Sequence, residues 1–214
     1  MLSFYEAYKR DEIHFKTTVH AHNWRAGTVI ESKFDTVIEL IAKGVRGHAD
    51  EVIEQWGEAS ENIEESSRKL AEKINSSVPE NGDVLLVAHS MGTEVVQHAI
   101  DSLRKDIDIY LFLMGGIANS LAYEDLIEQN SKIRLVYNYY SDNDFILNRY
   151  LPAIGAGYID PIGTTTIDGE KISNINTKSG HSDYFSSNSV LSTYTELVTS
   201  LLNKSPDTYL HFST

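Results

Sequence analysis

Ser90, Asp144 and His181 are three residues of this sequence whose types and order fit nucleophilic catalysis. A serine alcohol is a poor nucleophile at neutral pH. It attacks a carbonyl only when a histidine takes its proton and a carboxylate holds that histidine in the right tautomer. Where the serine sits on a strand-to-helix turn of an α/β protein, the chain order is serine, acid, histidine. The sequence therefore predicts acyl transfer through an acyl-enzyme formed on Ser90.

The stretch AHSMG carries the serine between an apolar run at 84–88 and an amphipathic segment. A sharp turn exposes Ser90 only if the residues two positions before and after it are small, and Ala88 and Gly92 meet this requirement. The following helix turns its N-terminal N–H groups toward an oxyanion beside the serine, so we expect Met91 to be the first oxyanion donor. The other interpretation is a tight turn in which the serine side chain accepts a hydrogen bond from the free N–H groups at the helix N-terminus.

The general base has to be chosen from eight histidines. His181 lies in the glycine-containing segment SGHSDYF, after the last predicted strand, where such a base is expected. His211 follows the last predicted helix, and we interpret it as a surface tail residue. His89 adjoins the serine but leaves the turn in another direction, so we interpret it as packing or lining. The remaining histidines come too early in the chain or, like His98, lie within the helix after the serine.

Two aspartates are candidates for the acid, because Asp142 and Asp144 both follow the predicted strand at 132–140 in the segment YNYYSDNDFIL. Either can also be a turn or helix N-cap residue. We choose Asp144, directly before the hydrophobic FIL, although its position in the loop does not by itself separate it from Asp142. Asp183 is too close to His181 in the chain to be the first choice, and we expect it to support the site from further out.

The elements that position these residues alternate between strand and helix. Apolar runs and β-branched residues predict strands at 15–22, 84–88, 107–114, 132–140 and, more weakly, 171–177. Helical spacing of apolar residues predicts helices at 34–46, 49–74, 93–105, 123–128, 145–150 and 189–202. This alternation implies right-handed crossovers and an α/β fold, with a mostly parallel sheet covered by helices on both faces, in one domain that spans 1–214.

Composition narrows the class of partner. The chain has 214 residues, of which 41% are hydrophobic, enough for one sizeable core. A net charge of -13 disfavours nucleic acid and anionic membrane surfaces as partners. The absence of cysteine excludes thiolate metal sites and cysteine nucleophiles. No stretch has the length of a membrane-spanning helix or the apolar core of a signal peptide, so we expect no integral membrane segment and a cytoplasmic protein.

These motifs resemble those of the α/β-hydrolase fold superfamily, in which AHSMG is a variant of the Gly-x-Ser-x-Gly turn. Within it, the chain is most similar to the family of predicted serine hydrolases that includes the eukaryotic transmembrane-and-coiled-coil-domain proteins. The shared features are Trp56 with KLAEKI ahead of the serine, NYYSDNDFIL after it, DPIG at 160–163 and GHSDY at 180–184.

The resemblance implies roles and an activity. It makes Ser90 the nucleophile, Asp144 the acid and His181 the base. It implies an esterase or lipase-like hydrolysis of a carboxylic ester, either a small molecule or a lipid, with no cofactor. An acyltransferase that uses the same acyl-enzyme is an alternative within this class.

One feature departs from that superfamily. Its members usually take the second oxyanion N–H from the loop after an early strand. Here the first strand-like segment, TTVHAHNWRAG at 17–27, resembles the strand that follows that one in the superfamily. We therefore expect a fold shortened at the N-terminus, with the second donor coming from 23–27, elsewhere in the chain or a partner chain. Such a sheet would have an open edge, available for self-association or for another chain.

Two alternatives to a competent serine hydrolase follow. Loss of one oxyanion donor typically costs roughly a hundred- to a thousand-fold in turnover, so the chain could be a catalytically weak binding or scaffold protein with an incomplete oxyanion hole. A metal-dependent hydrolase is suggested by His20 and His22, which share one face of a strand. No third ligand has suitable spacing, so we expect no metal.

Overall fold

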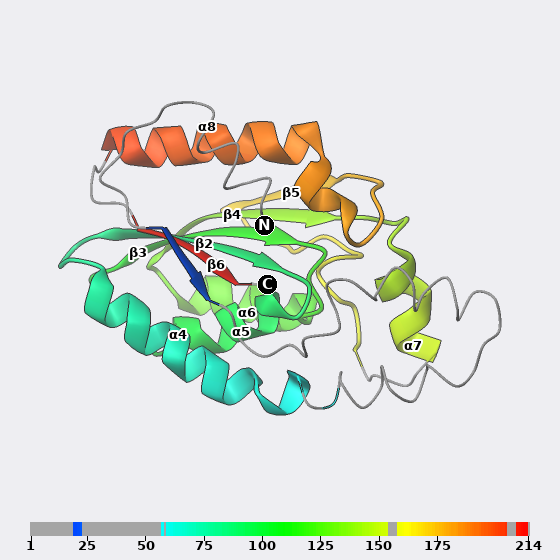
Figure 1. Ribbon diagram of the computed structural model, residues 1–214, viewed down its shortest axis with the longest axis horizontal. Coiled ribbons are helices and arrows are strands. Elements are labelled where there is room, and N and C mark those ends of the chain that lie inside the picture. The colour runs from blue at the N-terminus through cyan, green and yellow to red at the C-terminus, as the bar shows by residue number, and fades with distance from the viewer. Residues whose placement is uncertain (1–18, 23–56, 58, 154–157, 205–208, 214) are drawn as a thin grey trace.

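The computed structural model describes residues 19–22, 57, 59–153, 158–204 and 209–213. Within these ranges the strands form one parallel sheet in the order β1-β6-β2-β3-β4-β5 (Figure 1). The strands are β1 (Val19–His22), β2 (Asp83–His89), β3 (Asp108–Met114), β4 (Ile133–Tyr140), β5 (Ile172–Asn176) and β6 (Tyr209–Ser213). The protein therefore belongs to the α/β class.

Helices cover both faces of this sheet (Figure 1). α4, α5 and α6 lie on one face and α8 lies on the other. Their bounds are α4 (Ile63–Ser77), α5 (Gly92–Ile100), α6 (Ser120–Gln129) and α8 (Asn188–Lys204). Shorter helical segments are the π-helical turn η2 (Ile146–Tyr150), α7 (Leu151–Ala153) and the 3-10 turn η3 (Asp183–Ser186). None of the helices in the described ranges is both long and apolar enough to cross a membrane.

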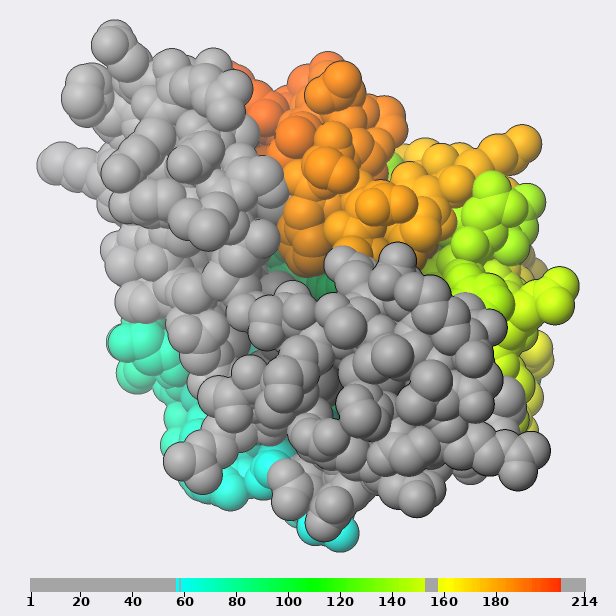
Figure 2. Space-filling model, turned by 45° about the vertical axis from the view of Figure 1, so that its right-hand side comes forward, coloured from blue at the N-terminus to red at the C-terminus, as the bar shows by residue number. Residues whose placement is uncertain are grey.

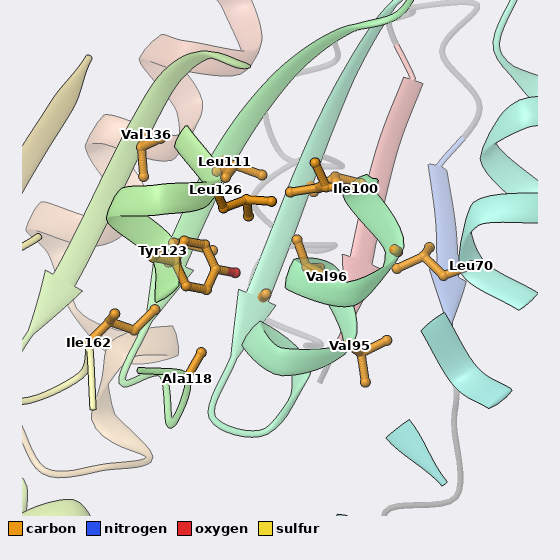
Figure 3. Packing of buried hydrophobic residues seen from close by; sticks show 14 of the residues in the cluster. Leu70, Val95, Val96, Ile100, Leu111, Ala118, Tyr123, Leu126, Val136 and Ile162 are labelled. Carbon is orange, nitrogen blue, oxygen red and sulfur yellow. The ribbon is translucent and has the colours of Figure 1, made fainter. Parts of the chain in front are cut away.

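Strand β2 is buried on both faces, which explains its continuous apolar sequence. Successive side chains of a strand point to opposite faces. Val84 and Leu86 pack with α5 residues such as Val96 in the cluster shown in Figure 3. Leu85 and Val87 belong to the second cluster, on the other face, with residues of α8. The strand that leads to Ser90 is therefore held between two hydrophobic layers.

α5 ends earlier than the sequence predicts. Helical spacing continues to residue 105, but the helix stops at Ile100. The carbonyls of Ile100 and Leu103 accept hydrogen bonds from the Lys132 ammonium at 2.7 Å and 3.0 Å. A lysine from the segment before β4 therefore replaces the donors that further helix would have supplied.

Arg104 connects the end of α4 to the turn before β3. Its guanidinium donates to the carbonyls of Asn75, Val78 and Pro79 at 2.7, 2.9 and 2.9 Å. It also pairs with the carboxylate of Asp106 at 3.2 Å. The last carbonyls of a helix have no intrahelical donor, so this one side chain satisfies groups that would otherwise depend on water.

We expect Arg104→Ala to lower the free energy of unfolding by about 2 kcal/mol, because several charge-assisted hydrogen bonds are lost together. Arg104→Lys keeps the positive charge but not the planar guanidinium with its several donors, so it should lower the free energy of unfolding by about half as much. Urea denaturation measures both. Arg68→Ala is the control, because Arg68 makes an exposed pair with Glu72 on α4 and should contribute less than about 0.5 kcal/mol. Equal losses in the Arg104 and Arg68 variants would contradict this account.

Strand β6 is absent from the sequence prediction, and the interpretation of His211 as a tail residue is wrong. The backbone of His211 lies inside the sheet, in register with His20 of β1 and Leu86 of β2. A five-residue strand inserted between two distant strands has partners that no local pattern reveals.

Several expectations fall wholly or partly outside the described residues. They include the helix at 34–46, the loop at 23–27 and Trp56. The strand predicted at 15–22 is described only as β1, and the long helix predicted at 49–74 is described as α4. Among the described strands β1 and β5 form the two edges of the sheet.

Candidate active site

Ser90 lies directly after β2 and before α5, in a turn of restricted geometry. Its φ is +53°, a left-handed conformation that residues other than glycine rarely adopt and that the surrounding structure must hold in place. Its N–H donates to the carbonyl of Met114 at 3.1 Å. Its carbonyl accepts from Thr93, through the N–H at 3.1 Å and the hydroxyl at 2.7 Å, and from the N–H of Ile117 at 3.3 Å. The turn therefore presents Ser90 at the carboxyl edge of the sheet.

Ser90, His181 and Asp144 lie together in a chain of hydrogen bonds. His181 Nε2 is 2.9 Å from Ser90 Oγ, and His181 Nδ1 is 2.8 Å from Asp144 Oδ2. A carboxylate only accepts, so Nδ1 carries the proton and Nε2 is left to accept the serine proton. Asp144 is fully buried and His181 is 9% exposed. This is the order of groups that a serine nucleophile needs.

The structure distinguishes the two candidate acids. Asp144 is buried, and its Oδ1 also accepts the N–H of Leu147 at 3.1 Å, in the first turn of η2. Asp142 is exposed. Of the two aspartates that loop position left open, Asp144 is therefore the one in contact with His181.

Hydrogen bonds tie the loop of the acid to the loop of the histidine. Ser141 Oγ donates to the carbonyl of Ser179 at 2.6 Å, and the Asn143 amide donates to the carbonyl of Lys178 at 3.1 Å. The N–H of Ser141 donates to the carbonyl of Gly163 at 2.9 Å. In Figure 2 the segments that follow β4 and β5 lie side by side on one face. Sequence reasoning missed Ser141 and Asn143, whose only signal is that they are polar residues between a strand and FIL.

Asp183 supports the turn that carries His181. Its carboxylate accepts the N–H of Gly180 at 2.9 Å, and its own N–H donates to the carbonyl of Gly180 at 3.1 Å. It therefore shapes the histidine loop from outside the chain of Ser90, His181 and Asp144, as the sequence predicts.

Gly115 allows the histidine loop to approach the sheet. Its φ is +49°, and a Cβ at this position would lie 2.8 Å from Tyr184 Cε2 and 3.4 Å from His181 Nδ1. A side chain here would therefore clash with the ring of Tyr184, and its Cβ would be in van der Waals contact with the His181 imidazole.

His89 does more than the packing that we predict from the sequence. Its Nε2 lies 2.8 Å from the carbonyl oxygen of His181. Desolvation, reinforced by the nearby His181, lowers the pKa of His89 to about 3, so the ring is neutral at neutral pH. A neutral imidazole has one N–H, and a carbonyl can only accept, so Nε2 carries that proton. The interpretation of His89 as packing or lining therefore does not include its hydrogen bond to the histidine loop.

Met91 occupies the position of the predicted oxyanion donor. It is the N-cap residue of α5, with a φ of -63°. Within the described part of the chain its N–H makes no hydrogen bond. This N–H is therefore available to an acceptor beside Ser90. The segment predicted to supply the second donor, 23–27, lies outside the described residues.

The histidines behind the metal alternative lie in β1, where the backbone alone is described: His20 and His22. Among the side chains that the structure describes, no group of three or more His, Cys, Asp or Glu residues could hold a metal ion.

Comparisons of the chain with protein-family models, with curated proteins and with solved structures find no match.

Proposed function

We propose that the protein is a serine hydrolase of the α/β-hydrolase fold that cleaves carboxylic esters through an acyl-enzyme on Ser90. One observation carries the proposal: Ser90, in a strand-to-helix turn with φ of +53°, lies 2.9 Å from His181 Nε2, while Nδ1 of the same ring lies 2.8 Å from buried Asp144. The packing of a core does not require a serine, a histidine and a carboxylate joined in this order by hydrogen bonds. The resemblance of AHSMG, NYYSDNDFIL and GHSDY to α/β-hydrolases supports the same roles.

In the proposed reaction Ser90 Oγ bonds to the ester carbonyl carbon while its proton passes to His181 Nε2. The tetrahedral oxyanion accepts the N–H of Met91, aided by the positive end of α5. The carbon–oxygen bond to the leaving alcohol then breaks, and His181 protonates that oxygen. Asp144 stays ionised and stabilises the imidazolium.

A water molecule completes the cycle. It gives a proton to His181 Nε2 as it bonds to the acyl carbon, and collapse of the second intermediate returns this proton to Ser90 Oγ and releases the carboxylic acid. Every proton is moved by Ser90 and His181. The proposed cycle therefore uses no cofactor, and we propose a small-molecule or lipid ester as its substrate.

A fluorophosphonate probe tests the proposal, because it reacts only with an activated serine. We expect the wild-type protein to gain one probe on the peptide that contains Ser90, as measured by mass spectrometry. Ser90→Ala should gain none, and His181→Ala should react at least about 10³-fold more slowly. Ser192→Ala is the matched control, because Ser192 is an exposed serine on α8, and it should label like the wild type. A folded wild-type protein that does not label, or a Ser90→Ala variant that still does, would overturn the proposal.

A further inference from the structure

We propose that His89 is a positioning residue for His181: its hydrogen bond to the His181 carbonyl and its ring contact hold the imidazole of His181 at Ser90. The inference deepens the proposed function and rests on it. It assigns a role to the second residue of AHSMG, which the reaction itself does not use.

The hydrogen bond attaches the histidine loop to an interior strand of the sheet. His89 is the last residue of β2 and is in register with Met114 of β3, so its backbone is fixed by the sheet. From there its Nε2–H reaches the carbonyl of His181, 92 residues away in the chain, at 2.8 Å. The loop that carries the proposed base is therefore tied directly to the strand that carries the proposed nucleophile.

Aromatic contacts restrict the His181 ring and the His89 ring together. The centroids of these two rings are 4.8 Å apart. The centroids of the Phe185 and His89 rings are 4.9 Å apart, in an edge-to-face arrangement. Gly115 lies close on the Nδ1 side of the His181 ring. Rotation of the His181 imidazole away from Ser90 would disturb these contacts.

A neutral ring suits this position. Because the pKa of His89 is lowered to about 3, its N–H remains a donor to the carbonyl and places no cation beside His181. The imidazolium that forms on His181 during the reaction therefore meets no repulsion from this neighbour. A lysine or arginine could make the same hydrogen bond but would oppose that charge.

Two substitutions separate the hydrogen bond from the ring. His89→Phe keeps a ring of similar size and loses the donor. His89→Gln loses the ring, but its amide nitrogen can occupy the place of Nε2. Since a misplacement of about 1 Å can cost about a hundred-fold, we expect His89→Phe to lower kinact for the fluorophosphonate by about 10- to 100-fold, with KI changed less than about threefold. His89→Gln should recover to within about fivefold of the wild type.

The control variant is His98→Phe, which replaces an exposed histidine of α5 and should behave like the wild type. Thermal unfolding checks that each variant is folded. If His89→Phe does not fold, His89→Asn replaces it, because the shorter amide cannot reach the carbonyl.

A second readout does not depend on turnover. The proton on His181 Nδ1, hydrogen-bonded to Asp144, should give a low-field ¹H NMR signal that is absent in His181→Ala. We expect the signal in the wild type and in His89→Gln, and a broadened or missing signal in His89→Phe. A wild-type kinact in His89→Phe, or a His89→Gln variant as slow as His89→Phe, would overturn the inference. Failure of the wild type to label would instead overturn the proposed function, and the NMR comparison would still decide the role of His89.

Discussion

Asp144→Asn is expected to lower kcat for ester hydrolysis by about 10⁴-fold while KM changes little. The asparagine keeps the size of the side chain, but its amide would donate to His181 Nδ1, whereas the carboxylate accepts from it at 2.8 Å. The imidazole would then carry its proton on Nε2 and could not accept one from Ser90. Steady-state hydrolysis of a p-nitrophenyl ester measures the effect.

Asp142→Asn is the matched control for this prediction. Asp142 lies two residues earlier in the same loop, and its side chain is exposed. We expect this variant to keep kcat within about threefold of the wild type, since an exposed side chain that does not contact His181 can be substituted with a small effect. A collapse of kcat in Asp142→Asn with a normal rate in Asp144→Asn would show that the acid is wrongly assigned.

Gly163→Ala is expected to lower the free energy of unfolding by about 4 kcal/mol. A Cβ at this position would lie 2.5 Å from the carbonyl carbon of Gly115 and 2.6 Å from the nitrogen of Gly116, and these backbone atoms cannot rotate away. The N–H of Gly163 donates to the carbonyl of Gly116 at 2.7 Å, and the carbonyl of Gly163 accepts from the N–H of Ser141 at 2.9 Å. Displacement of the Gly163 backbone therefore weakens both hydrogen bonds. The same shift moves the loop of the acid, so labelling should slow as well.

Gly57→Ala controls for the general effect of adding a methyl group. Among the described residues no atom outside its own helix and chain neighbours lies within 4 Å of the position that its Cβ would take. Because Gly57 is helical, the alanine should raise the free energy of unfolding by about 0.5–1 kcal/mol rather than lower it. Urea unfolding compares the two variants. A Gly163→Ala variant with the midpoint of the wild type would contradict the close approach of the backbones.

The sequence predicts the strands around the site to within about two residues, because strands buried on both faces have continuous apolar runs. The run at 84–88 becomes β2, 107–114 becomes β3 and 132–140 becomes β4. The meeting of Ser90 with the acid and the base follows from the same reasoning, since the carboxyl ends of parallel strands share one edge of the sheet. The roles of these residues are still predictions.

Contacts between distant segments account for what the sequence does not predict. The hydrogen bond from His89 to the backbone of His181 joins residues 92 apart, and a backbone carbonyl leaves no trace in residue type. Ser141 reaches Ser179 across 38 residues in the same way. The sequence favours Asp144 over Asp142 only through its position directly before FIL, whereas the burial that distinguishes the two is seen in the structure.

The place of β6 in the sheet has a consequence for the order in which the chain folds during synthesis. Strands β2 to β5 can pair one after another as they leave the ribosome, because each neighbour in the sheet is also the next strand made. β1 is made before the other described strands, but its partner in the sheet is β6. At about 5–20 residues per second, roughly 10 to 40 s separate the synthesis of His22 from that of Tyr209. Of the described strands, the first to emerge is therefore the last to join the sheet, and until then one side of β2 is open to incorrect pairing.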